Sequence, residues 1–150
     1  MKRTITKEFS WDCAHRLYNP ELDDDKNKEI FGNCFSVHGH LYRMFVTVSQ
    51  KDNNLENGMI VNFKDLKKIV KEEIVDIMDH SLTLTDGDPL LVGLDKDMKM
   101  NLNIVSYITT CEHQIADFWN KIKVRFHGTD IQLEEIKLYE TPTSFATLSR

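Results

Sequence analysis

The sequence predicts an α+β fold in which an antiparallel sheet carries helices on one side. Polar and apolar residues alternate from Phe9 to His15 and again from about His40 to Ser49, which is the two-residue period of a half-buried strand. Two later segments carry apolar residues at helical spacing, and an alternating segment follows each of them. Strands with helices inserted between them in this order favour helices layered on one face of an antiparallel sheet.

Each of the first two strands has one mostly apolar face. On the first strand this face consists of Phe9, Trp11, Cys13 and His15. On the second strand it consists of His40, Tyr42, Met44, Val46 and Val48, and His38 extends the same row. Residues two apart share a face of a strand, so both rows are predicted to point into one core.

The first helix is predicted to begin after Asn62, which is a good N-cap and has Asp65 in the positive first turn. Its apolar stripe is Phe63, Leu66, Ile69, Val70, Ile74, Ile77 and Met78. A third strand is predicted from the alternation of Leu102, Ile104, Ser106 and Ile108. A second helix is predicted from about Cys111 to Val124, and a last strand lies within Ile131 to Glu140.

Three polar stretches are predicted to be irregular. The acidic stretch from Glu21 to Lys28 is typical of a solvated loop, and a second polar loop runs from Gln50 to Asn57. The third stretch, from Asp86 to Asn101, contains one short helical piece at Pro89 to Leu94.

Length and composition indicate one soluble domain over residues 1–150. Hydrophobic residues make up 41% and charged residues 29% of the 150 positions, which is typical of a globular chain. The net charge of −5 argues against a nucleic-acid partner, because such proteins carry a basic face. No apolar run approaches the roughly 18–20 residues of a membrane span, and no secretory signal is visible. The three cysteines indicate reduced thiols and a cytoplasmic location.

The histidines indicate a metal site. His38 and His40 are separated only by Gly39, so extended backbone points both imidazoles to one face, while the glycine allows close approach or an unusual dihedral angle. His15 ends the first strand, which can lie beside the second. Three protein ligands leave zinc an open fourth position, as in catalytic sites.

Cys34 leaves two alternatives open, because it comes four residues before His38. If the thiol and all three histidines bind metal, the site is a closed structural zinc site of one cysteine and three histidines. If only the histidines bind, Cys34 is a thiol beside a Lewis acid, available as a base or nucleophile. Such a thiolate needs a neighbouring cation or imidazole at neutral pH.

Two further candidate sites contain a carboxylate. Asp79 and His80 directly follow the first helix, and they fit either an acid–base pair or a histidine placed against the helix dipole.

Glu140 shares a strand face with Ile136 and Leu138. Burying a lone carboxylate is costly, so Glu140 either meets a partner or ligand there or lies in water at a frayed strand end.

The remaining cysteines and histidines indicate ordinary roles. Cys13 and Cys111 are predicted to be structural thiols, and His113 and His127 are predicted to be solvated.

Six motifs in this order resemble the family of 6-pyruvoyl- and 6-carboxy-tetrahydropterin synthases over nearly the whole chain. They are Phe9–Leu17 ending in Ala14-His15-Arg16-Leu17, Cys34-Phe35-Ser36-Val37-His38-Gly39-His40, Gly58–Phe63, Asp79-His80, Thr109-Thr110-Cys111-Glu112 and Tyr139-Glu140-Thr141.

The resemblance implies a tunnelling fold, a four-stranded antiparallel sheet with two helices on one face. Subunits of that family join their sheets edge to edge into a trimeric barrel, two trimers stack into a hexamer, and the active sites lie at subunit interfaces. Barrel closure removes exposed sheet edges.

The resemblance also implies the site residues. His15, His38 and His40 would bind zinc (Zn²⁺), Cys34 would abstract a proton, and Asp79 and His80 would form its partner relay. Glu140 would anchor the pterin ring and is counted in the relay, and Thr110 and Glu112 would border the pterin pocket.

The implied substrate is 7,8-dihydroneopterin triphosphate, a small pterin. The implied product is 6-carboxy-5,6,7,8-tetrahydropterin, with release of acetaldehyde and triphosphate, on the route to queuosine and other 7-deazapurines. Three residues between Cys34 and His38 resemble the 6-carboxy branch, because animal 6-pyruvoyl enzymes have a longer spacing. The alternatives are the 6-pyruvoyl product, cleavage of a related pterin such as sepiapterin, or a pterin- or metal-binding module without catalysis.

Three positions depart from the family pattern: Asn62 stands where Asp is usual, Leu41 where Asn is common and Thr109 where Pro is common. Insertions are expected at 21–29 and 86–101.

Overall fold

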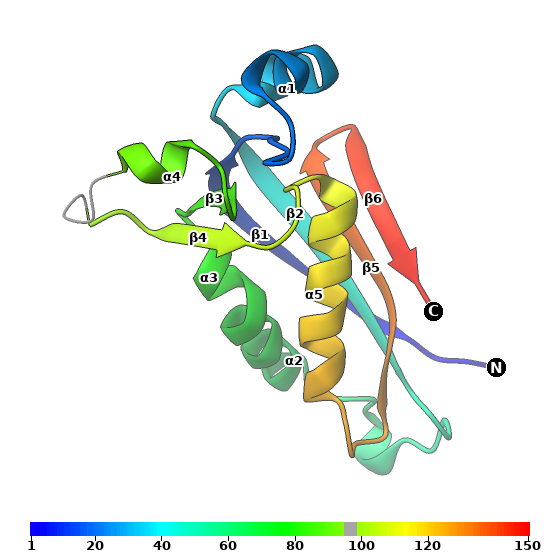
Figure 1. Cartoon of the computed structure of the whole chain (residues 1–150). Coiled ribbons are helices and arrows are strands. Elements are labelled where there is room, and N and C mark those ends of the chain that lie inside the picture. The colour runs from blue at the N-terminus through cyan, green and yellow to red at the C-terminus, as the bar shows by residue number, and fades with distance from the viewer. Residues whose placement is uncertain (95–98) are drawn as a thin grey trace.

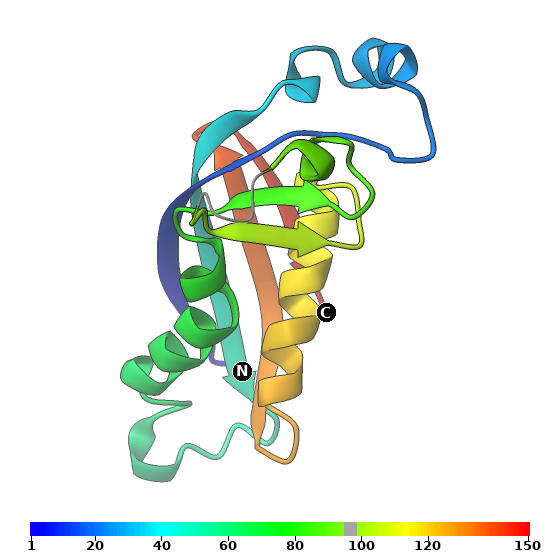
Figure 2. The same ribbon diagram turned by 60° about the vertical axis from the view of Figure 1, so that its left-hand side comes forward.

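A curved six-stranded sheet carries two long helical segments packed side by side on one face (Figures 1 and 2). The computed structural model describes residues 1–94 and 99–150. The strands are β1 (Ile5–His15), β2 (His38–Gln50), β3 (Leu82–Thr85), β4 (Leu102–Val105), β5 (Ile131–Thr141) and β6 (Ser144–Ser149). The helices are α1 (Asp24–Phe31), α2 (Phe63–Val70), α3 (Asp76–Met78), α4 (Leu90–Gly93) and α5 (Cys111–Arg125).

The strand order is β4-β3-β1-β2-β5-β6. The pairs β1–β2, β2–β5 and β5–β6 are antiparallel, whereas β3 is parallel to β1 and β4 is parallel to β3. The expected α+β class is confirmed, but the expected four-stranded antiparallel sheet is wrong, because the sheet has six strands and is mixed. The segment predicted to run to Ile108 as a strand ends at Val105.

Local pattern could not predict the two added strands. The strand β3 has only four residues, Leu-Thr-Leu-Thr, and both of its threonines are buried, so its alternation is short and does not mark a solvent-facing side. The strand β6 is polar and half exposed at the sheet edge, so its alternation is weak as well.

The two predicted helices cover the sheet as expected. The side chain of Asn62 accepts a hydrogen bond from the Lys64 backbone N–H at 2.9 Å and caps α2, so the predicted N-cap is confirmed. A π-helical turn at Lys71–Val75 joins α2 to α3. The core lies between these helices, α5 and the sheet. Its largest fully buried side chains include Trp11, Tyr42, Met44, Leu66, Ile74, Phe118, Ile122, Ile136 and Leu138.

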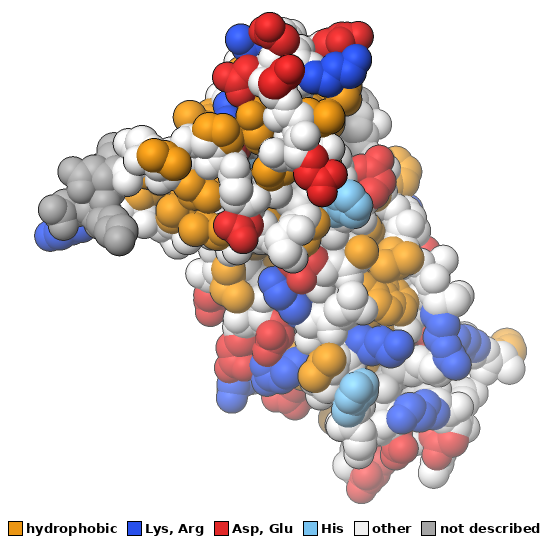
Figure 3. Space-filling view, in the orientation of Figure 1, with side chains coloured by type: hydrophobic (Ala, Val, Ile, Leu, Met, Phe, Trp, Pro, Cys, Tyr) orange, Lys and Arg blue, Asp and Glu red, His pale blue; other side chains and the backbone are white. Residues whose placement is uncertain are grey.

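The acidic stretch predicted as a loop contains α1, so that prediction is wrong. Asp23 caps the helix by accepting from the Lys26 N–H at 2.8 Å, and Asp24 and Asp25 occupy its first turn, where negative charge is favourable. Asn27 is fully buried and holds the preceding loop through bonds to Asn19, Leu22 and Asp23 backbone groups. Figure 3 shows acidic side chains gathered on this exposed helix.

The predicted short helical piece at Pro89 to Leu94 is confirmed as α4; residues 95–98 of the same irregular stretch lie outside the described residues. None of the described helices is long and apolar enough to cross a membrane.

Candidate metal centre and active site

The pairing of β1 with β2 brings three histidines together. His15 lies opposite His38, and Cys13 lies opposite His40, and residues opposite each other point to the same face. The ring centroids are 4.7 Å apart for His15 and His38, 5.2 Å for His15 and His40, and 4.8 Å for His38 and His40. One ligand atom from each histidine lies within 4.8 Å of the other two. The structure therefore holds a three-histidine cluster at the end of β1 and the start of β2.

Hydrogen bonds fix the proton on two of these rings. Nδ1 of His15 lies 3.0 Å from the Thr109 carbonyl oxygen, and Nδ1 of His38 lies 2.7 Å from the Ser36 carbonyl oxygen. A carbonyl can only accept, so each Nδ1 carries the proton and each Nε2 keeps its lone pair. This is the arrangement in which a backbone carbonyl orients a metal-binding histidine.

Burial favours the neutral form of two of the histidines, His15 and His40. It lowers the pKa of His15 from 6.5 to about 4, and the charges that His38 and His40 would carry act in the same direction. Burial, followed by His38, also lowers the pKa of His40. Neutral imidazoles are the form that binds metal.

The donor set fits a divalent transition metal. The Nε2 atoms of His15 and His40 are buried and have no hydrogen-bond partner among the described residues, and a buried polar atom without a partner is costly. Imidazole ligands favour zinc over hard cations. Three histidine donors on one side of a metal ion leave room for a further ligand on its other side.

Cys34 lies in a 3-10 turn at Gly32–Phe35, directly before β2. Its carbonyl oxygen accepts from the Leu17 N–H at 2.8 Å, which ties this turn to the end of β1, two residues beyond His15. The thiol is partly exposed. It lies outside the group of mutually close ligand atoms, so the geometry favours the open three-histidine site over the closed four-ligand one.

Glu140 lies at the edge of the cluster. Its Oε1 is 3.6 Å from Nε2 of His40, and its side chain is 25% exposed. Burial raises the pKa of Glu140 and Glu112 adds to this effect, whereas His38 and the Tyr42 hydroxyl lower it. A half-buried acceptor beside the cluster suits a ligand that presents N–H donors.

The first turn of α5 borders Glu140. Thr110 is the N-cap, and its side chain accepts from the His113 N–H. Glu112 follows in the first turn, close enough to Glu140 to raise its pKa. Thr110 and Glu112 thus lie at the N-terminal end of α5, and Glu140 lies near the C-terminal end of β5.

Asp79 and His80 do not join the cluster within this chain. His80 Nδ1 lies 2.8 Å from Asp79 Oδ1, and the His80 side chain is 81% exposed. It lines a hollow of about 460 Å³ with residues that include Asp12, Gly39 and Leu41. These three residues belong to the sheet face away from the helices, because their neighbours in the strands point into the core.

Gly39 has neither of the features expected of it. It is absent from the residues with positive φ, and an added Cβ would meet only the Cys13 carbonyl oxygen, at an ordinary 3.5 Å. Its absent side chain instead contributes space to the hollow beside His80.

The remaining thiols and histidines match their predictions. Burial raises the pKa of Cys13 to about 12 and that of Cys111 to about 11, so both stay protonated at neutral pH. His113 and His127 are exposed.

Sequence reasoning missed the polar groups buried behind the cluster. Arg16 forms a buried ion pair with Asp88 through two bonds, one from Nε at 2.8 Å. Gln114 is 1% exposed and donates to the Thr109 carbonyl oxygen at 2.8 Å. The available signal was a glutamine near Ile115 and Phe118 on the buried side of a helix, where an apolar residue is usual.

Fold and site together define a class of α+β proteins that carry a three-histidine centre where two antiparallel strands meet. The sequence model of the 6-pyruvoyl tetrahydropterin synthase family matches residues 4–150. The chain belongs to this family, and the resemblance inferred from its motifs is confirmed.

Relatives of both branches match the chain. It is 32% identical over 146 residues to a 6-carboxy-5,6,7,8-tetrahydropterin synthase of Haemophilus influenzae, covering 94% of each chain. It is also 32% identical over 140 residues to the 6-pyruvoyl tetrahydrobiopterin synthase of Homo sapiens, covering 91% of this chain and 84% of that one.

Solved structures share the fold. The 6-pyruvoyl tetrahydropterin synthase of Caenorhabditis elegans matches with a TM-score of 0.75 and 25% identity, over 100% of this chain and 96% of that one. An uncharacterised protein of Wolinella succinogenes matches with a TM-score of 0.81 and 20% identity, over 100% and 99% of the two chains. The second likeness supports the fold alone.

Proposed function

We propose that this chain is a zinc-dependent 6-carboxy-5,6,7,8-tetrahydropterin synthase. With one molecule of water, it converts 7,8-dihydroneopterin triphosphate into 6-carboxy-5,6,7,8-tetrahydropterin, acetaldehyde and triphosphate, in queuosine or 7-deazapurine biosynthesis. The observation that carries the proposal is the cluster of His15, His38 and His40, with the Glu140 carboxylate 3.6 Å from His40. The 6-carboxy relative that covers 94% of this chain and the spacing of Cys34 and His38 support this branch.

Each residue has a stated role in the proposal. Bound at the three histidines, zinc would supply a Lewis acid that polarises substrate oxygen. Cys34, as a thiolate, would remove a proton from the substrate side chain. Glu140 would accept N–H donors of the pterin edge, and Thr110 and Glu112 would border the ring.

His80 would return a proton, held in orientation by the Asp79 carboxylate at 2.8 Å. The same carboxylate accepts from the Asp12 N–H at 3.3 Å, and the Asp12 carbonyl accepts from the His80 N–H at 2.7 Å. The pair is thus fixed to β1 by its backbone while the imidazole remains exposed. A fixed backbone with an exposed imidazole suits a side chain that acts in the active site of a neighbouring subunit.

We therefore also propose that His80 serves the centre of a second copy, in a hexamer of two trimers whose sheets close into barrels. Along β1, the edge from Ile5 to Trp11 has no strand partner on one side among the described residues, and β6 is the free strand at the other end of the sheet. Open edges of this length favour pairing with another chain. The three unpaired thiols support a reducing compartment such as the cytoplasm.

The second candidate function is the 6-pyruvoyl product, formed by triphosphate elimination without carbon–carbon cleavage. Relatives named for this activity match at 31–33% identity, as closely as the 6-carboxy relative does.

The deciding experiment incubates the purified protein, loaded with zinc, with 7,8-dihydroneopterin triphosphate and identifies the products by mass spectrometry. We expect 6-carboxy-tetrahydropterin and acetaldehyde in equal amounts. A 6-pyruvoyl product would support the same site residues but assign the chain to the 6-pyruvoyl branch. Unchanged substrate with zinc bound would leave only the binding-module alternative.

A further inference from the structure

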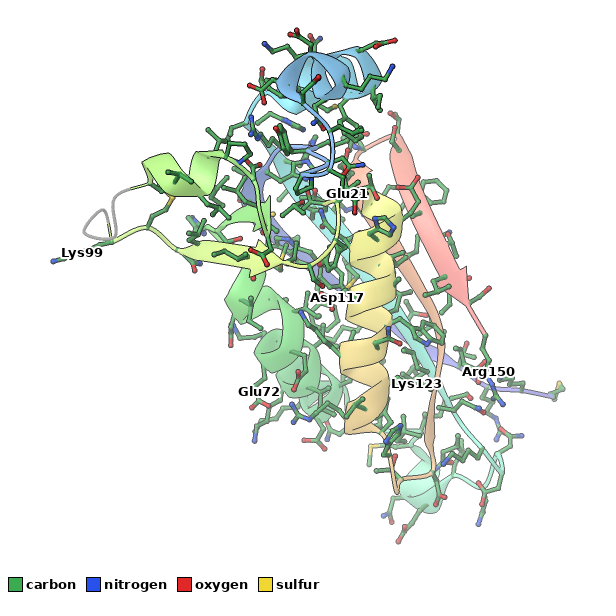
Figure 4. The ribbon with its side chains drawn as sticks, viewed as in Figure 1. Glu21, Glu72, Lys99, Asp117, Lys123 and Arg150 are labelled. Atoms are coloured by element: carbon green, nitrogen blue, oxygen red, sulfur yellow. The ribbon has the colours of Figure 1, made fainter. Side chains whose placement is uncertain are left out.

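A buried chain of hydrogen bonds lies behind the candidate centre and starts on α5. Asp117, labelled in Figure 4, marks the middle of this helix, and Gln114 lies nearly one turn closer to its N-terminus. The Gln114 Nε2 donates to the Thr109 carbonyl oxygen at 2.8 Å and to the Tyr42 hydroxyl oxygen at 3.4 Å. One amide therefore contacts two groups that lie next to the histidine cluster.

Thr109 leads to His15. Its carbonyl oxygen accepts from Gln114 and from Nδ1 of His15, using both lone pairs. Its hydroxyl donates to the Arg16 carbonyl oxygen at 2.9 Å and so presents a lone pair to the same Nδ1 at 3.2 Å. The amide of Gln114 thus holds the carbonyl that sets the orientation of a metal-ligating imidazole.

The second contact anchors the amide itself. Gln114 Nε2 donates to the Tyr42 hydroxyl oxygen at 3.4 Å. The Tyr42 ring is fully buried and stands edge-on to His40, with centroids 5.6 Å apart. The Gln114 amide is therefore held between Thr109 and a fixed ring beside the cluster.

The burial of Gln114 is poorly compensated as a matter of folding alone. Its Oε1 is buried and has no hydrogen-bond partner among the described residues. Burying an amide with an unmet acceptor is unfavourable, and an apolar side chain of the same size would avoid that penalty. The presence of a glutamine at this position is therefore explained by the groups to which its amide donates and not by a gain in folding stability.

We infer that Gln114 is a positioning residue of the candidate centre, which orients His15 through the Thr109 carbonyl group. The inference rests on the proposed function, since it takes the three histidines as metal ligands. It adds a residue on α5 that is not itself a metal ligand in the proposal.

The test replaces Gln114 by Met, which keeps the length of the side chain and removes its hydrogen bonds. The full-length, metal-stripped protein is titrated with Zn²⁺ in competition with a chromophoric chelator, and its Co²⁺ form is examined by visible absorption. We expect zinc affinity to fall roughly 10- to 100-fold, the range for lost outer-shell partners of a metal-bound histidine. The Co²⁺ spectrum should change as well, while the melting temperature of the metal-free protein stays equal or rises.

The matched control is Ile122→Met, which places the same side chain two helical turns further along the buried face of α5. Its zinc affinity and Co²⁺ spectrum should match those of the wild type. A second variant is Tyr42→Phe, which removes only the acceptor that anchors the Gln114 amide. It should lower zinc affinity less than Gln114→Met does.

The inference is overturned if Gln114→Met binds zinc as tightly as the wild type with an unchanged Co²⁺ spectrum; the proposed function then stands. If the wild type itself binds no zinc through its histidines, the inference and the proposed function are both wrong. Should Gln114→Met not fold, Gln114→Leu carries the same test, because it also removes both donors with an apolar side chain that suits a buried helical position. Undiminished zinc binding by that variant overturns the inference equally.

Discussion

Nε2 of His40 lies 3.6 Å from Oε1 of Glu140, so the end of β5 brings a carboxylate to the rim of the three-histidine cluster. The two side chains come from neighbouring regions of the sheet that are about 100 positions apart in the sequence. Their proximity divides the site into a metal-binding part and an acceptor part. Substitutions can therefore separate the two functions.

Replacing Glu140 by Gln is expected to weaken pterin binding and spare metal binding. The amide keeps the size but offers an N–H where the pterin would present its own donors, and an unpaired buried donor costs about 1–3 kcal/mol. Isothermal titration with neopterin should show a loss of about ten- to a hundredfold in affinity, with zinc content unchanged. His38→Ala is the converse control, in which zinc content itself should fall.

Replacing Cys34 by Ala is expected to leave zinc bound and reduce turnover. Loss of a proton-abstracting group lowers rates by roughly 10²- to 10⁴-fold, and the thiol lies outside the close histidine group. Metal content and the rate of substrate loss are measured on the same preparation. Cys111→Ala, which removes a protonated and partly buried thiol, is the control. Loss of zinc from Cys34→Ala would instead establish the closed four-ligand site.

His80 is expected to be strained by its backbone. Its φ of 59° lies in the left-handed region, which costs a non-glycine residue roughly 1–2 kcal/mol. His80→Gly should therefore be more stable than His80→Ala by about 1 kcal/mol in urea unfolding, although both lack the same exposed imidazole. Both variants should be equally inactive. Equal stabilities of the two variants would show that the strain is absent.

Mixing two inactive variants should restore activity if His80 serves a second copy. Cys34→Ala and His80→Ala are unfolded together, refolded together and assayed. With random assembly, about a quarter of the sites would combine Cys34 of one copy with His80 of another. The separately refolded variants are the control, and a mixture as inactive as they are would place both groups within one chain.

The metal-free protein is expected to lose stability as the pH falls from about 6.5 to 4. The pKa of His15 is lowered to about 4 in the fold, so in this window the unfolded chain binds a proton that the folded chain does not. One such group contributes a slope of up to about 1.4 kcal/mol per pH unit, and the lowered pKa of His40 acts in the same direction.

The measurement is urea unfolding with a chelator present at several pH values, for the wild type and for His15→Gln. The variant should show the smaller loss of stability towards low pH, because glutamine does not titrate. Equal slopes for the two proteins would mean that His15 is not held neutral by burial.

The sequence by itself determined much of this protein, because the signals are local. Alternation along β1 and β2 placed His15, His38 and His40 on core-facing rows, and the Asn62 cap with its apolar stripe marked the first helix. Such patterns follow from strand and helix geometry within a few residues. The order of the motifs then indicated the family to which the chain belongs.

Only the tertiary structure decided the rest. The short strand β3 pairs with β1 across more than sixty positions, and its two threonines are buried, so its four-residue alternation does not mark a solvent-facing side. The side of the sheet on which His80 lies depends on that pairing, because Ser81 accepts a backbone bond from Ala14. The role of Gln114 depends on its hydrogen-bond partners Tyr42 and Thr109. These residues approach it only after the strands and the helix have packed, so the sequence near Gln114 does not reveal what the buried amide contacts.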